Sequence, residues 1–373
     1  MRNRRFVLWP VILAIVLLAT AACGAQPQTA SSNQASAGDA SKAAAPAPQL
    51  EPTLVFAFGG GTLEQALREQ VLPLFEKQTG VKVTMAAGTA AQNFAKTQAN
   101  KNNPPFDLVW TSEETHLQGK AAGVWQPLDP KVVTNLNNAY PEFRDPDNVG
   151  APFGFVIIGL AYNSKIFADK GFKPPTSWQD LWNPAYKGHV GAYSWATAFS
   201  ADFLVSLSKS LGGNEQNTTA ALDRLKSLAP DIINVFPDPG SLDNSFIQGD
   251  TWIAYNSNAR VLAQSQSGLP IKFVAPKEGA TFHPVFLDTP VNAAHPNAAR
   301  AFINFWLSPE VQRLMPKAVQ YAPVVPNATI PSDLAEFIPS PDSRKQFLFV
   351  DRKVIVDRNQ ELSQLWDKVL QKP

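Results

Sequence analysis

The chain has 373 residues, of which 45% are hydrophobic and 17% are charged, and its formal net charge is +1. Nine Trp and 23 Phe can fill sizeable hydrophobic cores, and the length suits two domains. A net charge near zero, without a basic stripe, argues against a nucleic-acid partner. The single cysteine, Cys23, leaves the rest of the chain without a disulfide, a thiol nucleophile or a cysteine metal site.

The N-terminal segment indicates export. Three arginines lie among the first five residues, and the almost wholly apolar run over residues 6–20 is too short to span a bilayer comfortably. Small residues lead up to Cys23, an arrangement that resembles a bacterial lipobox. We therefore predict a lipoprotein signal peptide over residues 1–22 and a diacylglyceryl group on Cys23. An ordinary signal peptide, with Cys23 incidental, is the alternative.

A low-complexity segment follows the cysteine. Residues 24–49 are mostly Ala, Ser, Gln and Pro, with hardly any large apolar side chain. Such a composition cannot bury enough apolar surface to offset the entropy lost on ordering. We predict a flexible linker over residues 23–50 that tethers an extracytoplasmic domain to the bacterial membrane, in the periplasm or at the cell surface.

Strand and helix patterns alternate along the first part of the remaining chain. Strands are predicted over residues 53–58, 81–85 and 106–110, a helix is predicted to begin after Thr62 as its N-cap, and another helix is predicted over residues 90–99. Residues 111–114 read as a polar turn after the third strand. The alternation is typical of a parallel α/β sheet.

The second part of the chain repeats this alternation. The predicted strands cover residues 155–162, 189–193, 251–255, 271–275 and 286–291. The predicted helices cover residues 176–182, 197–211, 259–266, 296–307, 308–318 and 360–370. The fold class is therefore α/β.

Three segments carry a resemblance to a known family. They are residues 74–83 (LFEKQTGVKV), residues 176–188 (TSWQDLWNPAYKG), and Pro276-Lys277-Glu278-Gly279 with Asn292-Ala293 and residues 302–311 (FINFWLSPEV). In this order and spacing, the chain resembles the polyamine-binding and ferric-iron-binding branches of the ABC-importer extracellular solute-binding proteins.

The resemblance implies a two-lobed periplasmic-binding-protein fold of type II, in which each lobe is a mixed, mostly parallel sheet flanked by helices. It implies crossings between the lobes near residues 153–157 and 283–286 and near Thr329. The first lobe would comprise residues 52–154 and 284–328, and the second residues 155–283 and 329–373. The resemblance further implies a monomer that binds a small molecule in the cleft by hinge closure and delivers it to a membrane permease and its ATPase.

Candidate ligand contacts follow from the rule that ligands bind at the carboxyl ends of strands in open α/β sheets. The candidates are Gly60, Gly61, Thr62, Gly88, Thr89, Thr111, Ser112, Tyr193, Ser194, Trp195, Tyr255, Asn256, Asn258, Arg260 and His283. The turn at Tyr255 to Asn258 is favoured because its position matches the family's aromatic-plus-Asn cleft loop. Arg260 could clamp a carboxylate or phosphonate in a bidentate manner, although a solvated helix arginine is more common.

The chain departs from both branches at the residues that would grip a ligand. Residues 192–197 (AYSWAT) replace the paired acids of the polyamine binders, and His283-Pro284-Val285 replaces their Trp-x-Asp. The adjacent tyrosines of the ferric-iron binders are absent. We therefore expect a small polar organic solute, such as a carboxylate, a phosphonate or a zwitterion. Polyamine and ferric iron remain alternatives, and polyamine gains support if Glu113 and Glu114 face the cleft.

Two other function classes were weighed. The four histidines are scattered and belong to no HExxH motif, and no GxSxG elbow is present, so we expect no enzyme, no metal site and no cofactor. A surface sensor on the same scaffold remains open, because a fold does not fix a function.

Overall fold

The computed structural model describes residues 49–326, 328–338 and 346–370. The predicted signal peptide, Cys23 and nearly all of the predicted linker lie outside the described residues. Within the described residues, no helix combines the length and apolarity that a membrane crossing needs.

The strands of the described residues form one sheet in the order β2-β1-β3-β9-β4-β7-β5-β6, and β8 pairs with β4. The strands are β1 (Thr53–Phe58), β2 (Lys82–Ala87), β3 (Leu108–Ser112), β4 (Ala151–Asn163), β5 (Val190–Tyr193), β6 (Ile232–Phe236), β7 (Ile253–Ser257), β8 (Ile271–Val274) and β9 (Thr281–Asp288).

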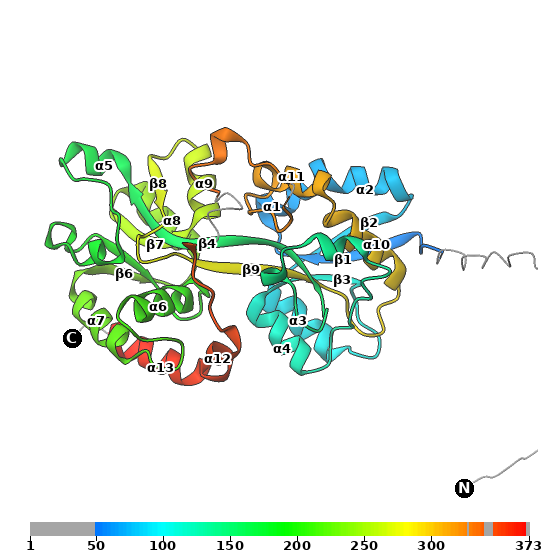
Figure 1. The fold of residues 1–373 in the computed structure, drawn as a ribbon. Coiled ribbons are helices and arrows are strands. Elements are labelled where there is room, and N and C mark those ends of the chain that lie inside the picture. The colour runs from blue at the N-terminus through cyan, green and yellow to red at the C-terminus, as the bar shows by residue number, and fades with distance from the viewer. Residues whose placement is uncertain (1–48, 327, 339–345, 371–373) are drawn as a thin grey trace, which may run out of the picture. The chain divides into compact units, whose positions relative to one another are not determined.

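Pairing within the sheet divides it into two groups of parallel strands. Strands β2, β1 and β3 are parallel to one another, as are β6, β5 and β7. The two groups are joined by β9 and β4, which pair antiparallel with each other and with their other neighbours. We call the part around β1, β2 and β3 the first lobe and the part around β5 to β8 the second lobe (Figure 1).

Strand β4 connects the lobes because it is long enough to pair with strands of both. It has 13 residues, all of them buried. Its first part pairs with β9, and its last residues pair with β7 and β8. The ladder with β9 is irregular between Pro152 and Gly154. A Cβ at Gly154 would come within 2.5 Å of Met315 Cε and 3.2 Å of the Ala322 carbonyl, so glycine lets the segment that follows residue 318 approach this strand.

The helices cover the faces of both lobes (Figure 1). They are α1 (Gly61–Ala66), α2 (Leu72–Thr79), α3 (Ala90–Ala99), α4 (Glu113–Ala121), α5 (Ser164–Asp169), α6 (Phe199–Ser210), α7 (Thr219–Leu228), α8 (Pro239–Gln248), α9 (Asn258–Gln266), α10 (Pro296–Trp306), α11 (Pro309–Ala318), α12 (Arg352–Asp357) and α13 (Asn359–Leu370). A π-helical turn, η1 (Leu67–Val71), joins α1 to α2. Short 3₁₀ helices are η2 (Thr134–Asn138), η3 (Pro141–Phe143), η4 (Trp178–Trp182), η5 (Pro184–Tyr186), η6 (Ala229–Asp231) and η7 (Ser332–Leu334).

Aromatic side chains fill the core of each lobe. In the first lobe, Phe302 of α10 contacts Phe56 and Phe75 at ring-centroid distances of 5.3 and 5.0 Å. In the second lobe, Phe203 of α6 stacks on Tyr255 at 4.4 Å. The C-terminal helix α13 packs on α7, and its Trp366 donates to the Tyr193 carbonyl at 3.0 Å. The C-terminal segment therefore completes the second lobe.

Most predicted elements are confirmed within a few residues, and β1 and α3 have the predicted bounds. Thr62 is not the N-cap of its helix, because α1 begins at Gly61 and Gly60 takes the capping position at a φ of 76°. The prediction of a turn over residues 111–114 is wrong, because β3 extends to Ser112 and α4 begins at Glu113 with Ser112 as its N-cap. Strand β9 begins at Thr281, five residues before the predicted start, and pairs with β4.

The predicted crossings at residues 153–157 and 283–286 lie in β4 and β9. The full division, residues 52–154 with 284–328 and residues 155–283 with 329–373, remains our proposal.

Candidate functional site

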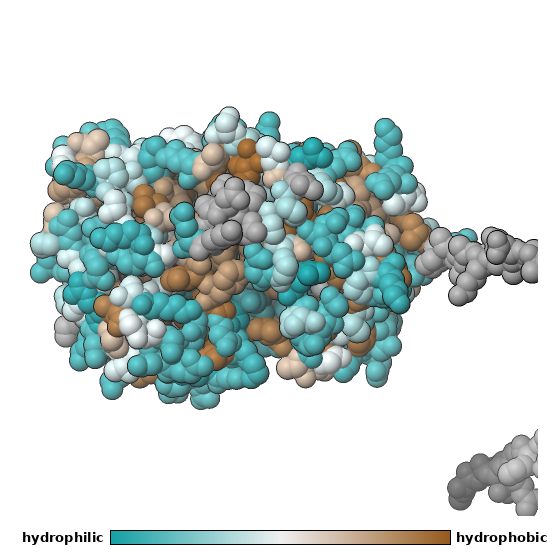
Figure 2. Space-filling model, in the orientation of Figure 1, coloured by the Kyte–Doolittle hydropathy of each residue, from teal (hydrophilic) through white to brown (hydrophobic). Residues whose placement is uncertain are grey.

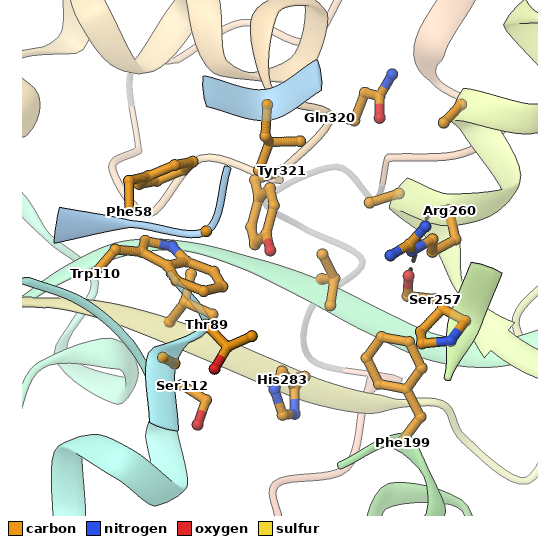
Figure 3. Close-up of a pocket in the computed structure, with 18 of the residues that line it drawn as sticks. Phe58, Thr89, Trp110, Ser112, Phe199, Ser257, Arg260, His283, Gln320 and Tyr321 are labelled. Atoms are coloured by element: carbon orange, nitrogen blue, oxygen red, sulfur yellow. Dashed lines mark hydrogen bonds between the residues drawn. The ribbon is translucent and has the colours of Figure 1, made fainter. Parts of the chain in front are cut away.

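A cavity of about 560 Å³ lies at the carboxyl ends of β1, β3 and β7 and over the middle of β4 and β9. Its lining residues are Phe58, Gly59, Gly60, Leu63, Thr89, Ala90, Trp110, Ser112, Val156, Phe199, Pro239, Ser257, Ala259, Arg260, Ala263, His283, Val285, Gln320 and Tyr321. Both lobes contribute, as Figure 3 shows. The volume is in the usual range for small-molecule sites. Figure 2 shows a mostly hydrophilic surface with hydrophobic residues gathered near the middle of this face, between the lobes.

Three hydroxyl side chains at the cavity are helix N-caps. Thr89 accepts the backbone N–H of Gln92 at 3.2 Å, and Ser112 accepts that of Thr115 at 3.3 Å. Ser257 caps α9 in the same way. The helices α3, α4 and α9 therefore start at the cavity wall, and the positive ends of their dipoles lie there.

Arg260 lines the cavity on the side of the second lobe, next to Ser257 (Figure 3). Its side chain is 46% exposed, and its Nη1 lies 3.3 Å from Asp243 Oδ2. Burial raises the pKa of Asp243 to about 6, although Arg260 opposes this rise. Among the lining residues that the structure describes, none is Asp or Glu. The cavity is thus lined by a cation and by no described carboxylate, although Asp243 pairs with that cation from behind the lining.

His283 forms part of the cavity floor on β9. Its Nδ1 lies 3.0 Å from Asp202 Oδ2, and the structure gives Nε2 no partner among the described residues. Burial and the charge of Arg352 lower the pKa of His283, but the hydrogen bond and charge of Asp202, with the charge of Glu114, outweigh them and raise it. Asp202 thus fixes the ring and favours a cationic imidazole at the cavity.

Four aromatic rings form the walls. Phe58 and Trp110 come from the ends of β1 and β3, with ring centroids 5.3 Å apart. Phe199 of α6 lies edge-on to His283 at 5.9 Å. Tyr321 extends its hydroxyl into the cavity from above, as drawn in Figure 3, and burial raises its pKa to about 12. The walls suit an apolar or aromatic body.

Comparison with known families identifies the class of protein. Residues 71–337 match the model of a family described as bacterial extracellular solute-binding proteins. The chain belongs to this family. The family and its named relatives are binding proteins, so this member is a binding protein and not an enzyme.

Relatives and solved structures agree with this assignment. The solute-binding chain is 29% identical to a spermidine/putrescine-binding periplasmic protein of Salmonella typhimurium, over 67% of this chain and 72% of the relative. It is 28% identical to a putrescine-binding periplasmic protein of Escherichia coli, over 66% and 72%.

The solved structures show the same fold. A putative extracellular solute-binding protein from Bordetella parapertussis has a TM-score of 0.73 at 22% identity, over 86% of this chain and 99% of that one. A spermidine/putrescine transporter substrate-binding protein from Streptococcus pneumoniae has a TM-score of 0.69 at 21% identity, over 86% and 100%. The predicted two-lobed periplasmic-binding-protein fold is confirmed.

The structure brings five of the predicted contact residues of this binding protein to the cavity. They are Gly60, Thr89, Ser112, Arg260 and His283. Gly61 and Thr62 open α1 next to Gly60. Gly88 precedes the α3 cap, and its carbonyl accepts from the Asn93 side chain at 2.9 Å.

Seven other predicted contacts are not among the described residues that line this cavity, and their contact with a ligand remains a prediction. They are Thr111, Tyr193, Ser194, Trp195, Tyr255, Asn256 and Asn258. Tyr193, Tyr255 and Asn256 are at most 1% exposed. The Tyr193 hydroxyl donates to Asn256 Oδ1 at 3.1 Å, and the Tyr255 hydroxyl accepts the Tyr193 N–H at 2.7 Å. These polar groups hold β5 and β7 together beneath the cavity.

Four further predicted contacts form hydrogen bonds within the protein. Asn258 accepts the Ile157 N–H at 2.8 Å, and Thr111 donates to Asp288 at 2.6 Å. The Ser194 N–H donates to Phe236 at 2.9 Å. Trp195 donates to Asn359 at 2.8 Å. Thr111 and Asn258 are buried, whereas Ser194 and Trp195 are partly exposed.

The sequence left open whether Glu113 and Glu114 face the cleft. In the structure both contact Arg352 of α12. Its Nε lies 3.0 Å from Glu113 Oε2, and its Nη1 lies 3.4 Å from Glu114 Oε1. Neither glutamate lines the cavity. No local pattern predicts this contact, because 239 residues separate Arg352 from Glu113.

The sequence analysis did not predict the four aromatic residues of the cavity wall, although the strand-end rule applies to two of them. Phe58 and Trp110 end the predicted strands 53–58 and 106–110, so the rule that selected Gly60 and Thr111 applies to them equally. Tyr321 and Phe199 carry no such signal, since neither follows a predicted strand.

Proposed function

We propose that this protein is the solute-binding component of an ABC importer, which captures a small polar organic solute between its lobes and presents it to a permease and ATPase. The observation that carries the proposal is the cavity at the meeting of the two lobes, with lining residues from both. A ligand that contacts both walls stabilises a closed arrangement over an open one.

Hinge closure requires few connections between the lobes. Strands β4 and β9 run from one lobe into the other as an antiparallel pair. Val156, His283 and Val285 of this pair lie at the base of the cavity. Bending of this pair would change the distance between Phe58 in the first lobe and Arg260 in the second. Closure would therefore directly change the contacts that a bound ligand makes with the two lobes.

The favoured solutes are carboxylates, phosphonates and zwitterions. Arg260 and His283 supply positive charge, and the capped N-termini of α3, α4 and α9 supply dipoles of the same sign. Charge-assisted hydrogen bonds to an anion would satisfy this set.

Polyamine is the second candidate, because the named relatives bind spermidine or putrescine. A desolvated ammonium group needs a carboxylate or several acceptors. The described lining residues offer hydroxyls but no carboxylate, and Glu113 and Glu114 are bound to Arg352. Ferric iron would require several hard oxygen ligands, and Tyr321 is the one phenol among the described lining residues. Both cations are less favoured than an anion.

The proposal includes export and lipid attachment through Cys23, with a monomeric receptor outside the cytoplasm. Metabolic labelling with a radioactive fatty acid tests the attachment. We expect label on the parent and none on Cys23→Ser, and an equally labelled Cys23→Ser variant would contradict it.

A thermal-shift screen combined with small-angle scattering tests the binding function. The panel should contain organic acids, phosphonates, amino acids, polyamines and metal complexes. We expect at least one compound to raise the melting temperature and to reduce the radius of gyration, with a smaller effect on Arg260→Ala. A panel that changes neither quantity would contradict the proposal. A compound that binds but is not taken up by cells producing the protein would favour a surface sensor.

A further inference from the structure

We propose, on the basis of the binding function above, that the ligand is an organic anion with one carboxylate or phosphonate head, an aromatic body and no ammonium group. The proposal names the chemical class within the broader set of polar solutes. It rests on the position of Arg260, on the carboxylates around it and on the order of side chains across the cavity.

Arg260 occupies an electrostatically unfavourable place in its own helix. It is the third residue of α9, and its N–H donates to the Ser257 cap at 3.3 Å. A cation in the first turn is repelled by the helix dipole, which favours anions there. The same dipole and the same guanidinium attract one anion together. A residue that goes against the helix dipole at a cavity wall is typical of a functional site.

The two carboxylates nearest Arg260 are already used by the protein. Asp243 contacts Arg260 Nη1 at 3.3 Å and accepts from Gln264 Nε2 at 2.6 Å. Asp238 caps α8 and accepts from the backbone and the hydroxyl of Ser241 at 2.9 and 2.7 Å. One of the five guanidinium N–H groups is thus engaged, and the remaining donors can form a fork with a carboxylate or phosphonate.

Asp243 and Asp238 would stabilise an ammonium group in the cavity only weakly. Neither lines the cavity, and each already accepts hydrogen bonds from protein groups. An amino group beside Arg260 and a cationic His283 would also be repelled by like charge. This argues against a polyamine and against an α-amino acid.

The body of the ligand is indicated by the side chains opposite Arg260. Figure 3 shows Arg260, Ser257 and Phe199 on one side of the cavity and Phe58 and Trp110 on the other, with His283 and Tyr321 between them. Aliphatic Leu63, Val156 and Val285 complete the apolar surface. An anion head at Arg260 therefore places the rest of the molecule among rings, where aromatic contacts are favourable.

Isothermal titration of the full mature protein with matched small molecules tests the proposal. The anionic probes are benzoate, phenylacetate, 3-phenylpropionate and phenylphosphonate. The comparison probes are 3-phenylpropionamide, 3-phenylpropylamine, phenylalanine, propionate and spermidine. We expect at least one anionic aryl probe to bind about 10-fold or more tightly than its neutral, cationic, zwitterionic or ring-free counterparts.

Variants locate the head of the probe. Arg260→Gln should weaken the aryl anion by about 10- to 100-fold through loss of charge-assisted hydrogen bonds, while Arg260→Lys, which keeps the charge but not the fork, should weaken it less. Arg224→Gln is the matched control, because Arg224 lies over Trp182 at 4.4 Å and bonds Gln179, away from the cavity. We expect no change of affinity for that control.

Several outcomes would overturn the proposal. Tighter binding of the amine, phenylalanine or spermidine than of every aryl anion would do so, as would propionate binding equally well. The proposal is also overturned if no aryl anion binds, or if Arg260→Gln binds the aryl anion as tightly as the parent. If another solute of the broader screen still compacts the protein, the binding function stands and the assigned class alone is lost.

Discussion

The Arg352 guanidinium donates through Nε to Glu113 Oε2 at 3.0 Å and thereby ties the C-terminal segment to the first lobe. The same side chain donates through Nη2 to Asp202 of α6 and to the Phe282 carbonyl of β9. It is 1% exposed. One buried cation therefore holds together α4 in the first lobe, α6 in the second and a strand that runs through both.

Removal of this cation should strongly destabilise the protein. Arg352→Met leaves Glu113, Glu114 and Asp202 close together without their shared partner, and breaking a buried ion pair costs about 3–5 kcal/mol. Urea unfolding at pH 7 measures the loss. The neighbouring Lys353→Met is the control, since Lys353 pairs with Asp357 on the surface and its replacement should leave the free energy of unfolding nearly unchanged. Equal stability of the two variants would contradict the prediction.

Glu113 should make stability fall as pH rises through the weakly acidic range. Burial raises the pKa of Glu113 from 4.5 to about 7, although Arg352 opposes the rise. The folded state thus binds a proton that the unfolded state has released, so stability is lost between pH 4.5 and 7 and stays low above pH 7. At about 1.4 kcal/mol per pH unit, the loss reaches up to about 3 kcal/mol.

Glu113→Gln removes the ionisation while it keeps the size of the side chain. We expect its free energy of unfolding to change less than that of the parent between pH 4.5 and 7, with denaturant curves as the measurement. Glu336→Gln is the control, because Glu336 pairs with Lys272 and its side chain is 51% exposed. A parent-like pH profile in Glu113→Gln would show that another group is responsible.

The outcome for individual residues shows what local patterns could predict. Thr89 was selected because it follows a predicted strand, and in the structure it also caps α3 in a capping box with Gln92. Arg260 was found because it follows β7, and the strand-end rule is a property of topology. Tyr193 and Asn256 obey the same rule but point inward, since successive side chains alternate between faces and a shift of one residue exchanges them.

Long-range partners explain what the sequence could not predict. The charge of Glu113 could be assigned to the cleft or to the core only once its partner was known, and that partner lies in the C-terminal segment. His283 was placed at a crossing between the lobes, but its orientation depends on Asp202, 81 residues away. Pair contacts of this kind leave no periodic trace in the sequence.

Asn258 should be important for stability because its amide bridges two separate segments. Oδ1 accepts the Ile157 N–H of β4 at 2.8 Å, and Nδ2 donates to the Phe337 carbonyl at 2.9 Å. The side chain is fully buried. Asn258→Ala leaves a buried donor and a buried acceptor unpaired, at a cost of about 1–3 kcal/mol each.

Calorimetric melting measures this effect. Asn100→Ala is the comparison, because the exposed Asn100 side chain donates to the Lys96 carbonyl at the end of its own helix. We expect a clear fall in melting temperature for Asn258→Ala and a small one for Asn100→Ala. If Asn258→Ala melts like the parent, then water or a rearranged partner satisfies both groups.

His116 should make the protein lose stability at alkaline pH. Its Nδ1 lies 2.9 Å from Asp288 Oδ1, its Nε2 lies 3.3 Å from Asp145 Oδ2, and its ring stacks on Phe286 at 4.2 Å. Burial by itself lowers the pKa of His116, but Asp288 and Asp145 outweigh burial and raise it from 6.5 to about 9. The histidine is therefore a buried cation at neutral pH, between two carboxylates.

The direction in which stability changes with pH follows from the raised pKa of His116. The folded state retains the proton to a higher pH than the unfolded state, so this stabilisation is complete below pH 6.5 and is lost as pH rises to about 9. The loss amounts to up to about 3 kcal/mol at about 1.4 kcal/mol per pH unit. It lies mainly above the range in which Glu113 titrates, so measurements from pH 7 to 9.5 separate the two groups. His283 titrates with the same sign, so part of the slope should remain without His116.

Unfolding of His116→Gln across this range tests the assignment. The variant should be less stable than the parent at pH 7, and the difference should shrink toward pH 9.5, because the parent loses an interaction that the variant lacks. His189→Gln provides the control, since His189 bonds the Asp250 carbonyl and stacks on Trp252. A constant difference between parent and His116→Gln at every pH would mean that the ring contributes by packing on Phe286 and not by its charge.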